Sequence, residues 1–365
     1  MATARAPLPD DLLQRPAAQA ARLIALRLLD DATEALSRLG TGDDPEALHD
    51  FRVAIRRLRS TLRAYKPLLR GSVRKKQRRQ LGEIARATNP GRDAEVQLGW
   101  LRGQAERLTP RERTDLRWLE ARLEERVNEE YAQVEARIRR EFAKASQRLR
   151  RRLAVYEQEV RSDGQTPLTL GAAAAEELRR SAADLTSRLE IVTTPEDAKT
   201  AHAARIAAKR VRYLLEPIAS QLPDGGGAAL VRRFKGVQDR FGDLADSHQF
   251  EEALAVALAE AAAERARRTL AASLEPAESG SSPGGGRDPR AGIIAIAKLV
   301  RARRNAVFGR IRGWLAAGEG AADLNREVEA VAAALAPAAA ASESTEPSER
   351  GVDARRRWRA KHRAR

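Results

Sequence analysis

The chain contains no cysteine, which excludes disulfide bonds and thiolate metal sites. Its apolar runs fall short of the ~18 residues that a membrane-spanning helix needs, so we expect no membrane insertion. The opening residues, MATARAPLPDDLLQRP, lack the apolar stretch of a secretory signal. These absences predict a cytoplasmic protein whose stability does not depend on covalent cross-links.

Aromatic residues are also scarce, at 4% of the chain, whereas alanine, leucine, arginine and glutamate dominate. Such a composition favours helix over sheet, and no segment reads as a strand. Hydrophobic residues reach 42%, enough for a sizeable core. Basic residues number 67 against 51 acidic ones, a net charge of +16 that implies an anionic partner or surface. We therefore predict an all-α protein that binds an anion.

Helical periodicity covers nearly every long segment, and the breaks between helices follow turn-forming residues. The tripeptide Asn89-Pro90-Gly91 is typical of a turn, and Asp93 and Asp246 fall at the starts of expected helices. We expect these two aspartates to be N-caps or partners of arginines. The segment that Pro110 opens exceeds a normal helix in length, and we expect a break within it. The expected helices are 16–39, 45–66, 72–88, one starting near 93, 110–159, 171–190, 196–216, 227–241, 246–275, 291–316 and 321–336.

One sequence pattern occurs twice in the chain, at positions 153 residues apart. Residues 49–60 read HDFRVAIRRLRS and residues 202–213 read HAARIAAKRVRY, with five of twelve positions identical. A period of this length is too long for a solenoid unit, so we interpret it as a duplicated half-domain, with one half at 10–160 and the other at 168–335. We expect a flexible loop at 276–290. A disordered tail should follow at 336–365, ending in the basic segment ARRRWRAKHRAR.

Each copy of the repeat places cations and apolar residues on neighbouring faces of one helix. On a helical wheel the cationic positions of the first copy fall within roughly 80° of one another. Arg57 and Arg210 fall off this face, and we expect them to flank the site or pair with acids. We call the two cationic faces the basic stripes; they consist of His49, Arg52, Arg56, Arg59 and Arg63 in the first half, and His202, Arg205, Lys209 and Arg212 in the second.

A run of charge on a helix is most often a solvated face, but two observations favour anion binding. Residues 51–82 contain twelve Arg or Lys and no Asp or Glu, whereas solvated helices usually mix both signs. The arrangement also recurs in the second half. Arginine matches phosphate oxygens bidentately, and side chains one turn apart are about 5.4 Å apart along the axis. We therefore predict that the two stripes face each other and bind a chain of phosphates.

The two histidines on the stripes are open to several roles. A lone histidine is more often structural than a ligand, but His49 and His202 each share a face with at least three cations. Neighbouring positive charge should keep the imidazole neutral, and a bound polyanion should favour its protonation. Phosphate contact and a structural role both stay open for them.

The doubled motif, His-x-x-Arg-Val-Ala-x-Arg-Arg-x-Arg and His-x-x-Arg-Ile-Ala-x-Lys-Arg-x-Arg-Tyr, resembles the CHAD family (conserved histidine α-helical domain). The segments 81–93 and 234–246 resemble the stretch after that family's basic helix, and the resemblance covers residues 10–335. It implies two pseudo-symmetric helical bundles around a central basic cavity. It also implies binding of inorganic polyphosphate, often at polyphosphate granules, without a cofactor. The residues carried over are His49, Arg52, Arg56, Arg59, His202, Arg205, Lys209 and Arg212, with Arg79 and Arg232 as weaker candidates on the following helices.

Three other functions were weighed against this one. A metal-dependent phosphohydrolase could start from His49-Asp50, but the chain has four histidines and Ala203 replaces the acid in the second copy, so we expect neither an enzyme nor a metal site. A scaffold docking an acidic protein fits a two-sided site poorly. Non-specific binding of nucleic acid is the main alternative, although single-strand binders normally interleave aromatic residues among the cations.

Overall fold

The computed structural model describes residues 7–39, 44, 46–155, 168–222, 225–274, 288–317 and 320–336. Most of the loop expected at 276–290, most of the joint between the halves and the tail from residue 337 lie outside the described residues. Within them the all-α prediction is confirmed, since regular structure is helical except for one isolated bridge. The helices are α1 (Ala17–Arg38), α2 (Ala47–Ala64), α3 (Lys75–Ala87), α4 (Asn89–Arg102), α5 (Pro110–Asp115), α6 (Arg117–Ala154), α7 (Leu170–Glu190), α8 (Ala198–Leu215), α9 (Gly226–Leu274), α10 (Arg290–Ala316) and α11 (Ala321–Leu335), with short 3-10 turns at Ala105–Arg107 and Ala219–Gln221.

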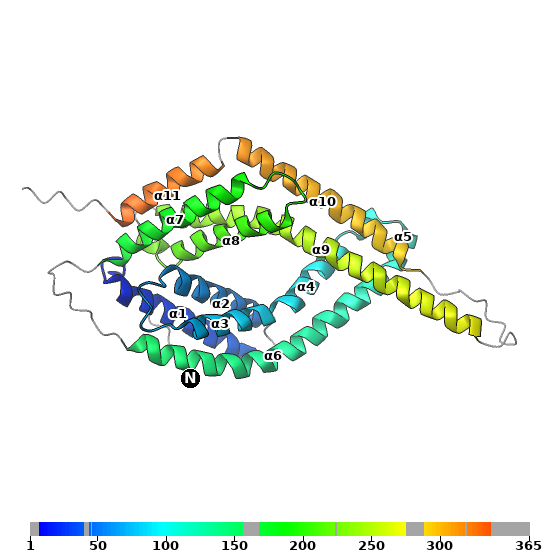
Figure 1. The fold of residues 1–365 in the computed structure, drawn as a ribbon, viewed down its shortest axis with the longest axis horizontal. Helices are drawn as coiled ribbons and strands as arrows, with labels where there is room; N and C mark the ends of the chain where they lie inside the picture. The colour runs from blue at the N-terminus through cyan, green and yellow to red at the C-terminus, as the bar shows by residue number, and fades with distance from the viewer. Residues whose placement is uncertain are drawn as a thin grey trace, which may run out of the picture.

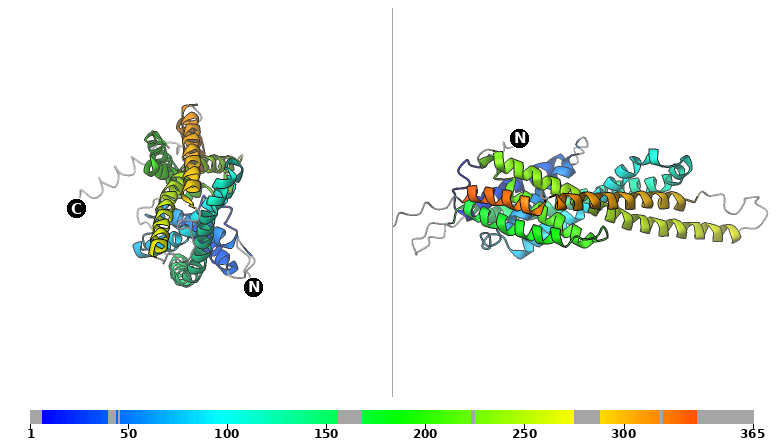
Figure 2. Two further views of the ribbon diagram at one scale, coloured as in Figure 1. Left: turned by 90° about the vertical axis from the view of Figure 1, so that its right-hand side faces the viewer. Right: turned by 90° about the horizontal axis from the view of Figure 1, so that it is seen from above.

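The helices form two groups that meet along α2 and α8. In one group α1 packs against α2 and α6, and α3 packs against α2 and α6; in the other, α8 packs against α7 and α9, and α11 against α7. Figure 1 shows the first group along the lower side of the molecule and the second along the upper side. Contacts of α2 with α8 and of α1 with α7 join the groups. Helices α9 and α10 run side by side as far as α5, and α9 continues beyond it and lengthens the molecule, as Figure 2 shows from above.

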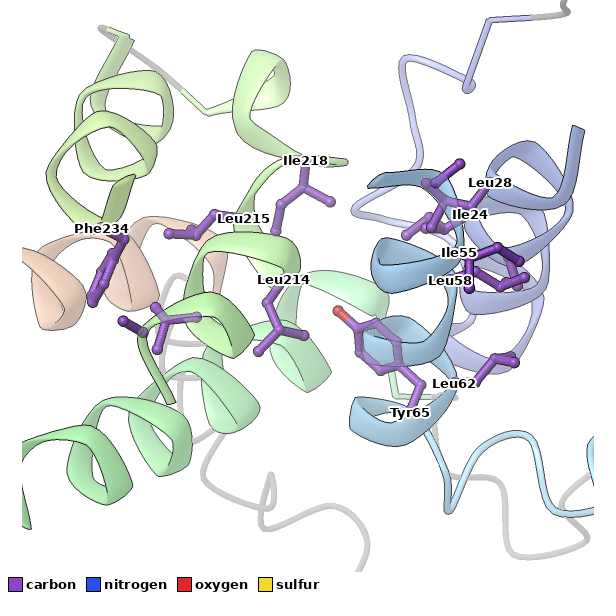
Figure 3. Packing of buried hydrophobic residues seen from close by; sticks show 14 of the residues in the cluster. Ile24, Leu28, Ile55, Leu58, Leu62, Tyr65, Leu214, Leu215, Ile218 and Phe234 are labelled. Carbon is purple, nitrogen blue, oxygen red and sulfur yellow. The ribbon is translucent and has the colours of Figure 1, made fainter. Parts of the chain in front are cut away.

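Both hydrophobic cores contain residues from both halves of the chain. In the larger core Ile55 and Leu58 of α2 point toward Leu28 of α1, whereas the ring of Tyr65 points toward Leu214 of α8 (Figure 3). The smaller core joins α4, α5 and the start of α6 to α9 and α10, and in it the rings of Trp100 and Phe250 meet edge to face at 5.6 Å. Because neither core is complete within one half, the two halves stabilise each other.

The helix positions agree with the offset between the sequence repeats. Helix α7 starts 153 residues after α1, and α8 and α9 start 151 residues after α2 and α3. The bridge pairs Pro16 with Thr169, again 153 residues apart, through hydrogen bonds from Ala17 to Leu168 (2.8 Å) and from Leu170 to Arg15 (2.9 Å). Equivalent residues touch each other only near a symmetry axis, so this contact is expected if the halves are related by a pseudo-twofold. Their common origin stays an interpretation of the sequence.

The prediction of a chain reversal at Asn89-Pro90-Gly91 is wrong, because these residues form the first helical turn of α4. Pro90 is tolerated there, since the first turn of a helix leaves its N–H groups unpaired. Gly91 is buried against the ring of Tyr131: a Cβ at this position would lie 2.7 Å from Cε1 of the ring. The glycine therefore serves close packing rather than chain reversal, and Asp93 lies inside α4 rather than at its N-cap.

The prediction of a break between residues 241 and 246 in the second half is also wrong, since α9 runs without interruption from Gly226 to Leu274. Gly242 lies in its interior, where an added Cβ would be 3.5 Å from Nη2 of Arg205. Asp246 is consequently a mid-helix residue and not an N-cap. The break expected in the segment after Pro110 does occur, at Leu116 between α5 and α6.

Candidate functional site

The first basic stripe lies on α2 beside a fully buried apolar face. Phe51, Ile55 and Leu58 of that face are 0% exposed, which fixes the rotation of the helix about its axis. Arg52 is consequently 8% exposed, whereas Arg56 and Arg59 are half-buried. In the described part of the chain, no ion pair joins the arginines of this stripe to an acid. The helix therefore holds a row of partly desolvated, unneutralised guanidinium groups.

The second stripe lies on α8, and its central residue is Lys209. This ammonium is half-buried, and burial together with the charges of Arg205 and Arg56 lowers its pKa from 10.5 to about 7. Arg205 and Arg56 belong to different halves, so the two stripes meet at Lys209. Within the described residues Lys209 has no carboxylate in ion-pair contact. A cation surrounded by cations is unfavourable until an anion binds beside it.

The off-stripe arginines pair with acids, as their position on the wheel predicts. Arg57 donates to Oε2 of Glu216 at 2.5 Å, a contact that joins α2 to the residue following α8. Oε1 of the same carboxylate lies 3.1 Å from Nε of Arg212, so this stripe residue is partly neutralised. Arg210 pairs with Asp184 at 3.2 Å. The pair of Arg57 with Glu216 thus joins the two halves, whereas the pair of Arg210 with Asp184 lies within the second half.

Two carboxylates lie near the stripe residues Arg52 and Arg205. Arg205 donates to Oδ1 of Asp246 at 3.3 Å, and Gln249 donates to Oδ2 of Asp93 at 2.8 Å. Burial raises the pKa of Asp93, and the charge of Asp246 contributes in the same direction while Arg52 opposes it. Asp93 and Asp246 are 153 residues apart, the same offset as the sequence repeat. Asp246 forms an ion pair with Arg205, whereas Asp93 acts on Arg52 through its charge without an ion pair in the described residues.

Two arginines near the stripes were missed from the sequence. The guanidinium of Arg86 lies beside that of Arg59 above Gly82. A Cβ added at Gly82 would be 3.5 Å from Nη2 of Arg59 and 3.6 Å from Nη1 of Arg86. Arg92 is held by Glu95 at 2.8 Å, and that carboxylate also accepts from the hydroxyl of Tyr131 at 2.7 Å. Comparing the repeats could not find them, because the equivalent positions in the second half are aspartate and alanine.

The remaining candidates lie at the ends of the stripes or away from them. His49 is exposed in the first turn of α2. His202 is exposed at the start of α8, where partial burial and the charges of Arg205 and Lys209 lower its pKa. Arg79 is exposed and pairs with Glu83 at 2.8 Å, and Arg232 faces a different pocket between α9 and α10; neither is brought to the stripes.

In the part of the chain that the structure describes, no group of three or more His, Cys, Asp or Glu side chains is arranged to hold a metal ion. No helix among those described is long and apolar enough to cross a membrane.

Comparison with known proteins places this site in a family context. The family model of the CHAD domain matches residues 23–255, which is more than half of the chain. Among solved structures the chain is similar to the crystal structure of the CHAD domain from the plant Ricinus communis. That match has a TM-score of 0.56 and 17% sequence identity, and it covers 86% of this chain and 92% of that one. No curated protein matches. The extent of the family match shows that this chain belongs to the CHAD domain family.

Proposed function

We propose that this protein binds inorganic polyphosphate at the junction of the two basic stripes and does not hydrolyse it. The observation that carries the proposal is the electrostatic repulsion between Arg56 and Lys209, two half-buried cations from different halves without a carboxylate in ion-pair contact in the described residues. An anion bound there would neutralise both. Family membership supports the same function, because CHAD domains are associated with polyphosphate.

The arrangement suits a linear phosphate chain better than a single phosphate. Arg52, Arg56, Arg59 and Arg63 follow one another at intervals of three or four residues on α2, which places them about 5 Å apart along the helix axis. Each guanidinium can donate two parallel hydrogen bonds to phosphate oxygens. A chain lying along α2 would also pass Lys209 of α8. Binding then releases condensed counterions and weakens with added salt.

The structure makes nucleic acid the weaker candidate for this site. Aromatic side chains for base stacking would have to come from Phe51, Tyr65 and Tyr213 in the repeats, and these are only 0%, 4% and 5% exposed. A site without stacking surfaces favours a polyanion without bases. Non-specific binding of nucleic acid by the basic tail beyond residue 337 remains an alternative, so the salt titration compares polyphosphate with single-stranded DNA.

The test is a salt titration of binding to long-chain polyphosphate and to single-stranded DNA of matched charge. We expect polyphosphate binding to persist at salt concentrations where the DNA has dissociated. Arg56→Ala combined with Lys209→Ala should weaken polyphosphate binding by at least about tenfold, as expected for the loss of two charge-assisted contacts. Arg52 and Arg205 are less suitable targets, since one is buried and the other is paired with Asp246.

A matched control removes the same charges elsewhere. Arg140 and Lys144 are exposed on the outer face of α6, so Arg140→Ala with Lys144→Ala should leave polyphosphate affinity within about twofold of the wild type. Equal losses in the two double variants, or equal salt sensitivity of polyphosphate and DNA, would mean a generic basic surface. Release of orthophosphate from polyphosphate by the purified protein would contradict the non-catalytic part of the proposal. Granule association is tested by whether a fluorescent fusion of the whole chain co-localises with polyphosphate in cells.

A further inference from the structure

A cationic pocket lies on α9, away from the basic stripes. It has a volume of about 490 Å³ and is closed on one side by Trp314 of α10. A volume in this range fits a small organic ligand. The pocket opens on a different flank of α9 from Gly242, which faces Arg205 in the stripe region, since Gly236 and Gly242 point about a third of a turn apart. Its lining includes Ala229, Arg232, Gly236, Val237, Arg240 and Trp314.

The arginines of this pocket differ in whether a carboxylate neutralises them. Arg233 is paired with Asp323 at 3.2 Å and with Glu327 at 3.1 Å, both on α11, and it forms a fixed wall. Arg232 is exposed, and among the described residues it has no acidic partner. Arg240 likewise has no acid in contact there; its guanidinium lies over the ring of Trp314, 5.2 Å from the centroid. Two cations and one aromatic surface are therefore available to a ligand.

The spacing of these groups selects for an elongated ligand. Arg232 and Arg240 are eight residues apart on one helix, which separates their backbone positions by about 12 Å along the axis. The guanidinium of Arg240 reaches back beside Gly236 and over Trp314, so a ligand that contacts both this end and Arg232 extends along at least about one helical turn. Planar rings stack on indole and guanidinium surfaces, so the Trp314 end suits a ring and the Arg232 end suits phosphate. Gly236 lies between them, and an added Cβ there would meet only Nη1 of Arg240, at 3.4 Å.

We propose that the pocket between α9 and α10 binds a nucleotide, with its phosphates at Arg232 and its base against Arg240 and Trp314. Inorganic polyphosphate lacks the ring, so this site is distinct in chemistry from the basic stripes and does not depend on the function proposed for them.

The test uses the full-length chain labelled with 5-fluorotryptophan and titrated with ATP, adenosine and tripolyphosphate, with fluorine NMR and calorimetry as readouts. The Trp314 resonance is identified as the one missing from Trp314→Phe. We expect ATP to shift it at concentrations at least about tenfold below those needed for adenosine or tripolyphosphate, because each of these lacks one of the two contacts. Arg232→Ala and Arg240→Ala should each weaken ATP binding by about tenfold or more.

Filling the pocket separates a true site from general attraction of anions. Gly236→Leu should abolish the shift of Trp314, whereas Gly309→Leu is the matched control, because Gly309 is exposed on α10 with nothing within 4 Å of an added Cβ. Arg56→Ala with Lys209→Ala should leave the ATP shift unchanged. Three results would each overturn the assignment: no shift of Trp314 by ATP, a shift that tripolyphosphate produces equally well, or a shift lost in the Arg56 and Lys209 variant.

Discussion

The low pKa of Lys209 makes the stability of the empty protein depend on pH in a definite direction. The folded protein holds the pKa at about 7, whereas the ordinary value of 10.5 applies to the unfolded chain. Below about pH 7 the lysine is protonated in both states, so the folded state bears the whole penalty of its partly buried charge. Between about pH 7 and pH 10.5 only the folded state releases the proton, and stability rises with pH. At 1.36 kcal/mol for each pKa unit, the penalty at low pH is roughly 5 kcal/mol.

Replacing this lysine by a neutral residue of similar length should therefore stabilise the protein, and more so at low pH. We expect Lys209→Met to raise the free energy of unfolding at about pH 6, with a gain that shrinks by about 3 kcal/mol at about pH 9. The measurement is urea unfolding followed by circular dichroism at both pH values. The groups that face Lys209 are Arg205, Arg56 and Arg212, which disfavour its charge, and Asp246, which favours it. All of them stay in place in the variant, so the difference reports on Lys209.

The control is Lys144→Met on the exposed face of α6, for which we expect no difference between the two pH values. A gain from Lys209→Met that is the same at both pH values, or a loss of stability at about pH 6, would refute the reasoning. The same variant should bind polyphosphate more weakly, because the cation that destabilises the empty protein is the one that the anion would neutralise. Stability and binding are thus expected to change in opposite directions.

Further predictions concern the two glycines of α4, the link between the halves, the tail and the pH dependence of binding. Wild-type affinity for polyphosphate should fall by up to about tenfold for each pH unit above 7, as binding takes up a proton at Lys209, and isothermal calorimetry in buffers of different ionisation enthalpy would detect that proton. Gly91→Ala should cost about 1–3 kcal/mol because a tyrosine ring occupies the space, whereas Gly99→Ala, with nothing within 4 Å, should be neutral or stabilising in thermal unfolding. Glu216→Gln should lower stability by about 1 kcal/mol through the loss of the partly exposed pair with Arg57, yet strengthen polyphosphate binding by removing an acid beside the stripe. Removal of residues 351–365 should reduce salt-sensitive binding to DNA and leave the polyphosphate site intact; loss of all polyphosphate binding would place the site in the tail.

Residues 89–91 were interpreted as a turn, and a break was expected between the helices 227–241 and 246–275. The glycines at these two places are Gly91 and Gly242. In the structure both lie inside helices, where the ring of Tyr131 and the guanidinium of Arg205 approach the backbone closely. A sequence shows where a Cβ is missing but not which distant side chain needs the space. The break after Pro110 was expected because the segment 110–159 is longer than an ordinary helix.

The features of the candidate site likewise divide into local ones, which the sequence predicts, and long-range ones, which it does not. The periodicity of α2 and α8 is local, so the sequence predicted which residues share each stripe and that Arg57 and Arg210 would not. The proximity of Arg56 to Lys209 depends on how two helices 150 residues apart pack, and only the tertiary structure decided it. The same holds for Arg86 beside Arg59 and for Asp93 near Asp246, because neither pair shares a helix or a local motif.

The sequence by itself determined the helical class, the two stripes and the family, because composition, periodicity and a doubled motif are properties of neighbouring residues. Only the tertiary structure decided which cations stay without a carboxylate in the described residues and how strongly each is desolvated. Those quantities arise from charges brought together across the two halves, and the free energy of a charge depends on every group within a few ångströms of it, wherever that group lies in the chain.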